Sequence, residues 1–392
     1  MFFHLKGMIL ILFFMAGNAF ASMPKKVFIS VDADTLSILK KKKFISYVPK
    51  TNSKISVVEV NKEDIEKISE VMHNEFRRCG GFMFHENYSD AKKVFDPVSK
   101  KVSLFVDYAI NRESVVANYL DQVDEKKIIE VIEKLSSFPN RHYQNTNGVT
   151  SQLWIKSNWA RLASVRSDIS VSEFKHRWKQ SSIILTIKGS KRSDEIIVFG
   201  GHGDSIAGSR YGRRAGNKAP GADDNASGIA VITELIRLVV DNNYVPQRTL
   251  KFISYAAEEV GLRGSREVAN SLKGQNVIGV IQFDMTNYKG SNNDITLVSD
   301  YTSSEQNAFL AKLIDRYVGA TWSYGKCGYA CSDHASWNSA GFAASFPFEA
   351  HIRNANPHIH SSRDTIDKSD YGAKHAVKFA KLGISYLIEM DQ

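Results

Sequence analysis

The chain has 392 residues, 43% hydrophobic and 24% charged, enough for one large domain plus a smaller one. Its net charge of +9 raises the question of an acidic partner such as nucleic acid or a membrane surface. The lysines are scattered, however. Their main run, Lys40 to Lys43, is typical of a solvated surface, and no nucleic-acid-binding motif accompanies it. We therefore expect no nucleic-acid partner.

The first 21 residues have the pattern of a signal peptide. Lys6 supplies positive charge, residues 8–16 form an apolar run, and Ala19 to Ala21 match a small-x-small cleavage site. The apolar run is too short to span a bilayer, and no later segment is long and apolar enough. The sequence predicts a secreted protein that reaches the outside through the periplasm if the source is Gram-negative, with no membrane insertion after removal of residues 1–21.

Residues 22–108, here called the N-terminal unit, are predicted to form a small α+β domain. Strand-like runs lie at 25–32, 54–61 and 101–108, and a stretch of helical periodicity lies at 62–78. No set of metal ligands is apparent in this unit. Its possible roles are a structural one, a binding or surface adhesion module, or a propeptide. Cys79 within it is left without a disulfide partner.

From residue 109 the pattern changes to that of an α/β domain, here called the large domain (109–392). Amphipathic helices are predicted at 124–136 and 150–165. Strands then alternate with helices, the strands at 181–189, 194–201, 249–257, 277–285 and 294–300 and the helices at 225–240, 265–274, 303–319 and about 370–390. Such alternation indicates a mostly parallel sheet covered on both faces, with sites at the carboxyl ends of its strands.

Five polar motifs lie close to these strand ends or helix starts. They are GGHGDS (200–205), PGADDNASG (220–228), AAEEVG (256–261), QFDMTNY (282–288) and NPHIHSSRDT (356–365). The candidate metal ligands in them are nitrogen and oxygen donors, namely His202, Asp223, Glu259, Asp284 and His360. Donors of this kind without thiolate suit zinc or a similar divalent ion. One catalytic zinc does not need five ligands, whereas two metals that share a bridging carboxylate use all of them.

The chemistry of the residues leaves several assignments open. Asp223 is the candidate bridge, with Asp224 as its supporting neighbour, although a residue of this loop could instead cap the following helix. Asp204 is a candidate to hold the imidazole of His202 in one tautomer, and a surface turn is the alternative for this motif.

Two of the remaining three motifs pose similar choices. Of Glu258 and Glu259, one would ligate and the other accept a proton, in an order that the residues alone do not decide. His358, His334 and His351 are rivals of His360.

Cys327 and Cys331 lie four residues apart in CGYACSDHASW. Export permits a disulfide between them. A Cys-x-x-x-Cys pair can also bind metal, but no further cysteine or close pair of histidines completes such a site. We therefore expect a disulfide.

The stretch from about 112 to 392 resembles the secreted bacterial leucyl aminopeptidases, two-zinc exopeptidases of metallopeptidase clan MH. The strings PGADDNASGIA, YAAEEVGLRGS, DMTNYKGS and CGYACSDHASW carry the resemblance. It implies a phosphorylase-like three-layer α/β/α fold, with a mostly parallel mixed sheet, and two Zn²⁺ ions per chain. By residue match, it implies that one zinc is held by His202 and Asp284, the other by Glu259 and His360, and both by Asp223.

The same resemblance implies roles for residues around the metals. Glu258 would be the general base, Tyr329 would steady the tetrahedral oxyanion, and Cys327 and Cys331 would be disulfide-bonded. A cis peptide bond is expected between Asp223 and Asp224. An apolar specificity pocket would be lined by Met285, Val298, Phe346, Phe348, Ile352 and Ile359. Close relatives usually carry larger aromatic residues at the positions of Ile352 and Ala355.

The sequence thus predicts a monomeric, secreted two-zinc aminopeptidase that removes bulky hydrophobic residues such as Leu from the N-termini of peptides. The metals would hold hydroxide and the substrate's α-amine, while Glu258 moves the proton. Alternatives are a zinc carboxypeptidase or amidase, and a noncatalytic peptide-binding relative. The N-terminal unit is predicted to be a removable propeptide that makes the protein a zymogen. It would cover the apolar pocket near Phe346 and Phe348 without touching zinc.

Overall fold

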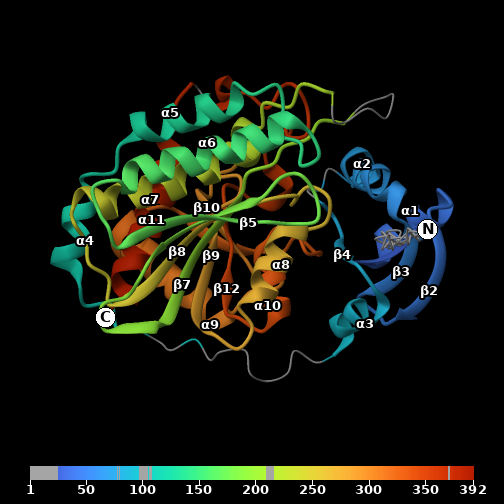
Figure 1. Ribbon diagram of the computed structural model, residues 1–392, viewed down its shortest axis with the longest axis horizontal. Coiled ribbons are helices and arrows are strands. Elements are labelled where there is room, and N and C mark those ends of the chain that lie inside the picture. The colour runs from blue at the N-terminus through green and yellow to red at the C-terminus, as the bar shows by residue number, and fades with distance from the viewer. Residues whose placement is uncertain are drawn as a thin grey trace, which may run out of the picture.

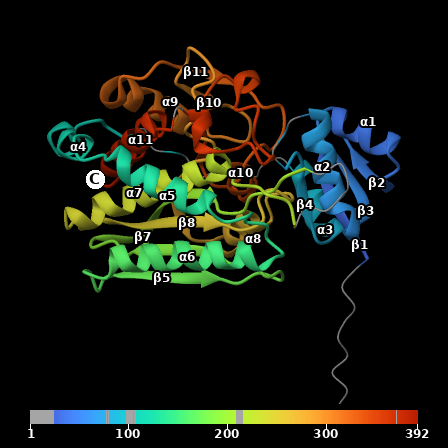
Figure 2. The ribbon, with the colours of Figure 1, turned by 90° about the horizontal axis from the view of Figure 1, so that it is seen from above.

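The structure of the protein is a computed structural model that describes residues 25–76, 78, 80–96, 105, 108–208, 216–369 and 371–392. The expected signal peptide, Cys79 and nearly all of the expected strand at 101–108 lie outside these residues. Figures 1 and 2 show two bodies, the N-terminal unit and the large domain, packed side by side. Within the described ranges, no helix has the length and apolar character needed to cross a membrane.

The N-terminal unit is an antiparallel sheet with helices against it. Its strand order is β2–β3–β1–β4, with bounds Ile45–Thr51, Ser56–Asn61, Lys26–Val31 and Met83–His85. The helices are α1 (Ala33–Lys41), α2 (Ile65–Phe76) and the short α3 (Tyr88–Ala91). Leu39 of α1 and Met72 of α2 pack on Val27 and Ile29 of β1. The predicted α+β character is confirmed, and Lys40 to Lys43 are exposed as expected.

A six-stranded mixed sheet forms the centre of the large domain, in the order β12–β9–β7–β8–β6–β5. The first four strands run parallel, with bounds Ala344–Ser345, Asn276–Gln282, Arg192–His202 and Arg248–Tyr255. β6 (Ser182–Ile187) and the edge strand β5 (Ile169–Phe174) are antiparallel to their neighbours. The expectation of a mostly parallel mixed sheet is confirmed, with β5 and β12 as unpredicted additions.

Alternate side chains of the central strands enter two different cores, because successive residues of a strand point to opposite faces. Ile197 and Phe199 of β7 belong to the larger core, whereas Ile196 and Val198 belong to the other. The larger core contains residues of α5 (Glu125–Ser136), α6 (Thr146–Ala163), α7 (Gly228–Asp241), α9 (Ser304–Leu313) and α11 (Lys374–Met390). The smaller contains residues of α8 (Arg263–Ser271) and α10 (His334–Ala340). The three-layer α/β/α architecture is therefore confirmed.

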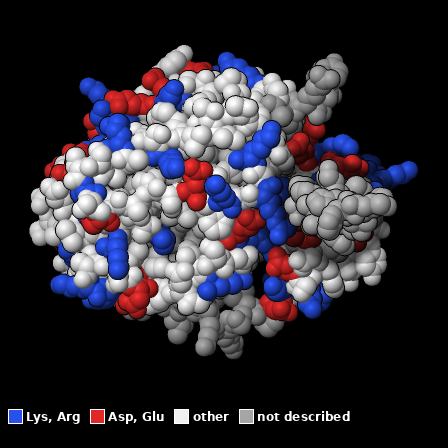
Figure 3. Space-filling view, in the orientation of Figure 1, with Lys and Arg blue, Asp and Glu red and all other residues white. Residues whose placement is uncertain are grey.

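The remaining elements frame this sandwich. α4 (Glu113–Leu120) packs on α11, and a second, three-stranded sheet has the order β11–β10–β13, with bounds Trp322–Gly325, Ile295–Val298 and Pro347–Phe348. The expected helix at 303–319 is α9 continued by one π-helical turn, Ile314–Val318. Figure 3 shows lysine and arginine side chains interspersed with acidic ones on the visible face, in agreement with a solvated charged surface.

Candidate metal centre and active site

The polar motifs meet because three parallel strands end at the same edge of the central sheet. In the strand register, His202 of β7 lies opposite Tyr255 of β8, and Gly200 lies opposite Gln282 of β9. The motifs of 256–261 and 282–288 therefore begin beside His202. This edge is where open α/β sheets form their sites, as the sequence predicted.

The first metal group consists of His202, Asp224 and Asp284, whose candidate ligand atoms all lie within 4.8 Å of one another. Nε2 of His202 is 3.1 Å from Oδ1 of Asp224 and 3.3 Å from Oδ1 of Asp284. Nδ1 of His202 donates to the backbone carbonyl of Asp204 at 3.1 Å, so Nε2 is left to face the carboxylates. The backbone carbonyl of Asp204 thus orients the ring of His202.

The second metal group consists of His73, Glu259 and His360. Nε2 of His360 lies 3.0 Å from Oε2 of Glu259 and 2.8 Å from Oδ2 of Asp224. Asp224 therefore points one carboxylate oxygen at His202 and the other at His360. This is the arrangement required of a carboxylate shared by two metals. His73 comes from α2 of the N-terminal unit, in which the sequence showed no ligand.

The carboxylate that lies between the two metal groups is that of Asp224, whereas Asp223 was the predicted bridge. The Asp223 carboxylate accepts hydrogen bonds from the backbone N–H of Asn287 at 3.0 Å and from Nδ2 of Asn356 at 3.1 Å, and it is also hydrogen-bonded to Glu349. Burial raises the pKa of Asp223 to about 6. Adjacent residues in this turn point in different directions, and the pattern Asp-Asp does not reveal which of them faces the metals.

The cis peptide bond is likewise displaced by one residue from its predicted position. It joins Asp224 to Asn225 instead of Asp223 to Asp224. The turn starts at Gly221, which has φ +54°, a value that favours glycine. A Cβ at this position would lie 2.4 Å from the carbonyl oxygen of Asp224, so the close approach of two backbone segments also requires glycine.

Two buried aspartates fix the backbone of the acidic pairs. Asp204 accepts the N–H groups of Glu258 and Glu259 at 3.0 and 3.2 Å. Asp364 accepts the N–H groups of Asp223 and Asp224, both at 3.1 Å. The sequence offered Asp204 as a supporting residue but did not single out Asp364. The only signal for it was its place in the motif 356–365.

Arg141 is a second residue that the sequence did not single out. It is fully buried, and its guanidinium donates to the backbone carbonyls of Gly203, Pro220, Gly221 and Leu135. Burial lowers the pKa of Arg141 to about 10, which still leaves it charged at neutral pH. It joins the His202 loop to the Asp224 loop and places a positive charge behind the acidic cluster.

Glu258 lies in the same buried cluster, with its Oε2 4.0 Å from Nε2 of His202. Neither carboxylate oxygen of Glu258 has a hydrogen-bond partner among the described residues. Burial raises the pKa of Glu258 well above its usual range. A buried carboxylate that binds a proton readily and faces the metal groups has the properties of a general base.

The imidazoles of the site are held by negative charge. Burial alone would lower the pKa of His360, but Glu259 and Asp224 raise it to about 10. The same competition, with Asp284 and Glu258 as the acidic neighbours, raises the pKa of His202 well above its usual value. The carboxylates around each Nε2 atom therefore stabilise a positive charge there. A bound divalent cation would supply such a charge.

Rival histidines lie outside both metal groups. Nε2 of His334 bonds to the carbonyl of Asp300 at 3.1 Å, and burial lowers the pKa of His334 to about 3. His351 is exposed, and the backbone N–H of His358 donates to Asn356. His360 is thus the histidine of motif 356–365 that reaches the carboxylates.

The disulfide and the apolar residues form a wall beside the metal groups. Cys327 and Cys331 are bonded, and they enclose Tyr329 in a short ring of chain. All six predicted pocket residues belong to one apolar cluster with Cys331 and Tyr329, and the cluster comprises Met285, Val298, Phe346, Phe348, Ile352 and Ile359, with Ala355 at its edge. The predicted set is therefore contiguous in space.

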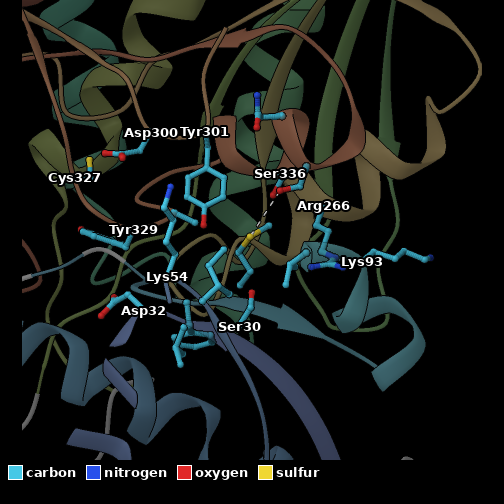
Figure 4. A pocket seen from close by; sticks show the side chains of 18 of the residues that line it. Ser30, Asp32, Lys54, Lys93, Arg266, Asp300, Tyr301, Cys327, Tyr329 and Ser336 are labelled. Carbon is cyan, nitrogen blue, oxygen red and sulfur yellow. Dashed lines mark hydrogen bonds between the residues drawn. The ribbon is translucent and has the colours of Figure 1, made fainter. Parts of the chain in front are cut away.

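Figure 4 shows a cavity of about 1180 Å³ between the two bodies. Tyr329 and Cys327 lie on the wall formed by the large domain, and Asp32 and Ser30 lie on the side of the N-terminal unit. Among the described residues, no member of either metal group lines it. The cavity is therefore a space next to the site and not the site itself.

The donor set fits a pair of divalent metals. Nε2 of His202, Nε2 of His360, Oδ1 of Asp284 and both carboxylate oxygens of Glu259 are buried without a hydrogen-bond partner in the described structure. Buried polar atoms are normally satisfied, and leaving one unpaired costs about 1–3 kcal/mol. Imidazole nitrogens and carboxylate oxygens are ligands that zinc prefers. Fold and site together define an α/β protein whose buried donors are suited to a pair of divalent metal ions.

Comparisons with known proteins specify this class further. The model of Peptidase family M28 matches residues 182–384. A probable leucine aminopeptidase of Arthroderma otae is 33% identical over 333 residues, which cover 83% of this chain and 88% of the relative. A probable aminopeptidase of Saccharomyces cerevisiae is 34% identical over 295 residues, covering 72% and 77%. The chain belongs to peptidase family M28 and is thus a peptide hydrolase of the metal-dependent type.

Solved structures give the same result for the fold. LapA aminopeptidase from Legionella pneumophila has a TM-score of 0.79 and 30% identity, covering 94% of this chain and 99% of the solved one. LapB from the same organism has a TM-score of 0.78 and 30% identity, covering 93% and 99%. Coverage of this extent can be reached only if the N-terminal unit is matched as well as the large domain.

Proposed function

We propose that this protein is a two-zinc aminopeptidase that removes hydrophobic residues from peptide N-termini. The observation that carries the proposal is Asp224, whose two carboxylate oxygens face His202 and His360 at 3.1 and 2.8 Å. His202 and Asp284 would hold one ion, Glu259 and His360 the other, and Asp224 both. The names of the relatives, which include probable leucine aminopeptidases, support the choice of reaction.

Zinc, when bound, supplies Lewis acidity that polarises the scissile carbonyl and lowers the pKa of water. The chain's own residues do the rest. Glu258 accepts the proton of the attacking water and returns it to the leaving amine, a role for which its carboxylate, close to His202 and without a hydrogen-bond partner among the described residues, is placed. Tyr329 donates a hydrogen bond to the oxygen that becomes negatively charged. No covalent acyl-enzyme is required.

The names of the relatives support an aminopeptidase over a carboxypeptidase. Asp224, Glu258, Glu259 and Asp284 are all buried in the site. Two divalent ions would offset the charge of these four carboxylates, so the choice between the two ends of a peptide rests on the relatives and on the test below. The apolar cluster around Phe346 and Phe348 adjoins the site and would receive the side chain of the first residue.

A pair of substrates tests the proposal. Leucyl-p-nitroanilide should be hydrolysed by the zinc-loaded protein, assayed as the full chain and after limited proteolysis, and N-acetyl-leucyl-p-nitroanilide should not. Metal analysis should find two zinc ions per chain, and a chelator should abolish turnover. Equal cleavage of the blocked substrate, or preference for a substrate with a free C-terminus, would contradict aminopeptidase action.

We also propose that the protein is exported with loss of residues 1–21. The motif at the start of the sequence supports this, and the disulfide between Cys327 and Cys331 is compatible with an oxidising compartment. N-terminal sequencing of protein from the culture medium tests it. A protein that stays in the cell with Met1 intact would contradict export.

A further inference from the structure

The N-terminal unit places a histidine in the second metal group. His73 lies on α2, is only 7% exposed, and offers a ring nitrogen within 4.8 Å of the ligand atoms of Glu259 and His360. The ring centroids of His73 and His360 are 3.6 Å apart. An imidazole from a different body of the molecule therefore enters the site itself.

The second ring nitrogen of His73 is held in the manner of a metal ligand. Nδ1 lies 2.5 Å from the backbone carbonyl of Arg78, and because a carbonyl only accepts, Nδ1 must donate. Nε2 is then the nitrogen whose lone pair can be given to a metal. His202 has the same arrangement, with Nδ1 donating to the carbonyl of Asp204. Metal-bound histidines almost always donate their other N–H in this way.

Helix α2 is fixed against the loop that carries the second metal group. Oγ of Ser69 donates to the backbone carbonyl of Glu259 at 2.6 Å. Ser69 and His73 are four residues apart, so they lie on the same face of α2. The backbone N–H of Phe84 donates to the carbonyl of Gly261 at 3.1 Å. The N-terminal unit is thus held beside His73 by contacts with Glu259 and Gly261, in the loop that carries the second metal group.

The chain after α2 continues across the catalytic residues. The Arg78 guanidinium lies over the ring of Tyr329, 4.5 Å from its centroid. Gly80 packs so closely that a Cβ on it would be 3.5 Å from the backbone carbonyl of Glu258 and 4.0 Å from its Oε1. The N-terminal unit therefore contacts the proposed base, the proposed oxyanion residue and the second metal group.

We propose that His73 is an internal ligand of the second metal ion, and that it keeps the full-length protein latent by excluding the substrate's amine. The inference rests on the proposed two-zinc function. It replaces the sequence-based expectation of a unit that covers the pocket near Phe346 and Phe348 without touching zinc. Activation then requires His73 to leave the metal, by cleavage or by undocking of the N-terminal unit.

Zinc X-ray absorption spectroscopy of the full chain tests the ligand directly and does not depend on turnover. The zinc-loaded wild type should show three imidazoles per pair of zinc ions, and His73→Ala should show two. His73→Gln, which retains most of the side-chain volume on α2, should also show two. Asn74→Ala is the matched control, because Asn74 is the exposed neighbour on the same helix and its loss should leave the count at three.

Zinc release to a chelator and peptide hydrolysis complete the test. The second zinc should leave His73→Ala and His73→Gln about 10–100-fold faster than the wild type, while leucyl-p-nitroanilide hydrolysis rises. Equal imidazole counts in wild type and both variants, or the same change in Asn74→Ala, would overturn the inference. If the count falls as expected but no form hydrolyses the substrate, His73 stands as a ligand and the proposed function fails instead.

Discussion

The acidic pairs Asp223–Asp224 and Glu258–Glu259 lie on different loops and share one design. In each pair, a distant aspartate accepts both backbone N–H groups, Asp364 for the first and Asp204 for the second. In each pair the second residue reaches the metal groups. These two hydrogen bonds fix the backbone of each pair. With the backbone held in this way, the carboxylate of the second residue points at the metal groups.

The pairs differ in what surrounds their first residue. Asp223 is hydrogen-bonded by Asn287, Asn356 and Glu349. The oxygens of Glu258 have no such partner in the described structure. A carboxylate whose lone pairs are already engaged is structural, and one whose lone pairs face a cluster of ligands is available for proton transfer. In both pairs the second residue reaches the metal groups, and the neighbours of the first residue decide its role.

The largest expected effect is that of Asp224→Ala. Removal of the shared carboxylate should abolish stoichiometric zinc binding at both positions, because each ion loses a ligand and the remaining ligands repel one another. Asp223→Asn should retain two zinc ions per chain. Elemental analysis after dialysis measures both, and two zinc ions in Asp224→Ala together with fewer in Asp223→Asn would restore Asp223 as the bridge.

Glu258→Gln should lower kcat by about 10²–10⁴-fold while two zinc ions stay bound, because a general base is lost and no ligand is. Glu259→Gln should instead reduce the zinc content. Steady-state kinetics together with metal analysis separates the two. Near-normal turnover in Glu258→Gln would exclude it as the base, and zinc loss in the same variant would make it a ligand.

Replacing either supporting aspartate should weaken metal binding by about 10–100-fold. In Asp204→Asn or Asp364→Asn, an NH₂ group replaces one of the two carboxylate oxygens. One of the two backbone N–H groups of the acidic pair then faces another donor instead of an acceptor. Asp364→Asn should weaken the binding of both ions, since Asp224 faces both metal groups. Asp204→Asn should chiefly weaken the binding of the second ion. Competition with a chromophoric chelator measures the affinities, with Asp241→Asn, an exposed position at the end of α7, as the control. Unchanged affinity in both variants would refute the shared design.

The smallest effect is expected for the backbone of the turn before Asp224. Gly221→Ala should lower the free energy of unfolding by more than the roughly 1–3 kcal/mol of a left-handed non-glycine residue, because the new Cβ would also meet the Asp224 carbonyl. Gly274→Ala is the matched control, since Gly274 has φ +88° with no atom within 4 Å of the added Cβ. Chemical denaturation of both variants measures the difference. Equal losses would mean that the turn tolerates a side chain.

Apolar periodicity predicted the central strands and most helices of the large domain, because β7, β8 and β9 are buried on both faces and read as continuous apolar runs. It missed β2 and β5, whose residues are largely half-exposed, and β4, which has only three residues. Burial is the source of the signal, so strands at exposed edges give a weak one.

The site residues could be predicted from the sequence where the end of a strand sets their position. They could not be predicted where an irregular turn or the N-terminal unit sets it. His202 is the last residue of β7 and Asp284 lies two residues after the end of β9, and the structure brings them together. Asp224 was confused with Asp223 because the direction of a side chain in an irregular turn depends on dihedral angles that the pair does not reveal. His73 was missed because an imidazole on a helix of another unit has no local pattern that relates it to Glu259.

The backbone N–H groups of Asp223 and Asp224 donate to the carboxylate of Asp364, which lies 141 and 140 positions later in the chain. During synthesis, His360 and Asp364 are added only after the loop of Asp224 has been made. Until then, that loop has neither the carboxylate that holds its backbone nor the imidazole that it faces. A fragment that ends before residue 360 therefore lacks both a member of the second metal group and the acceptor that fixes the first acidic pair.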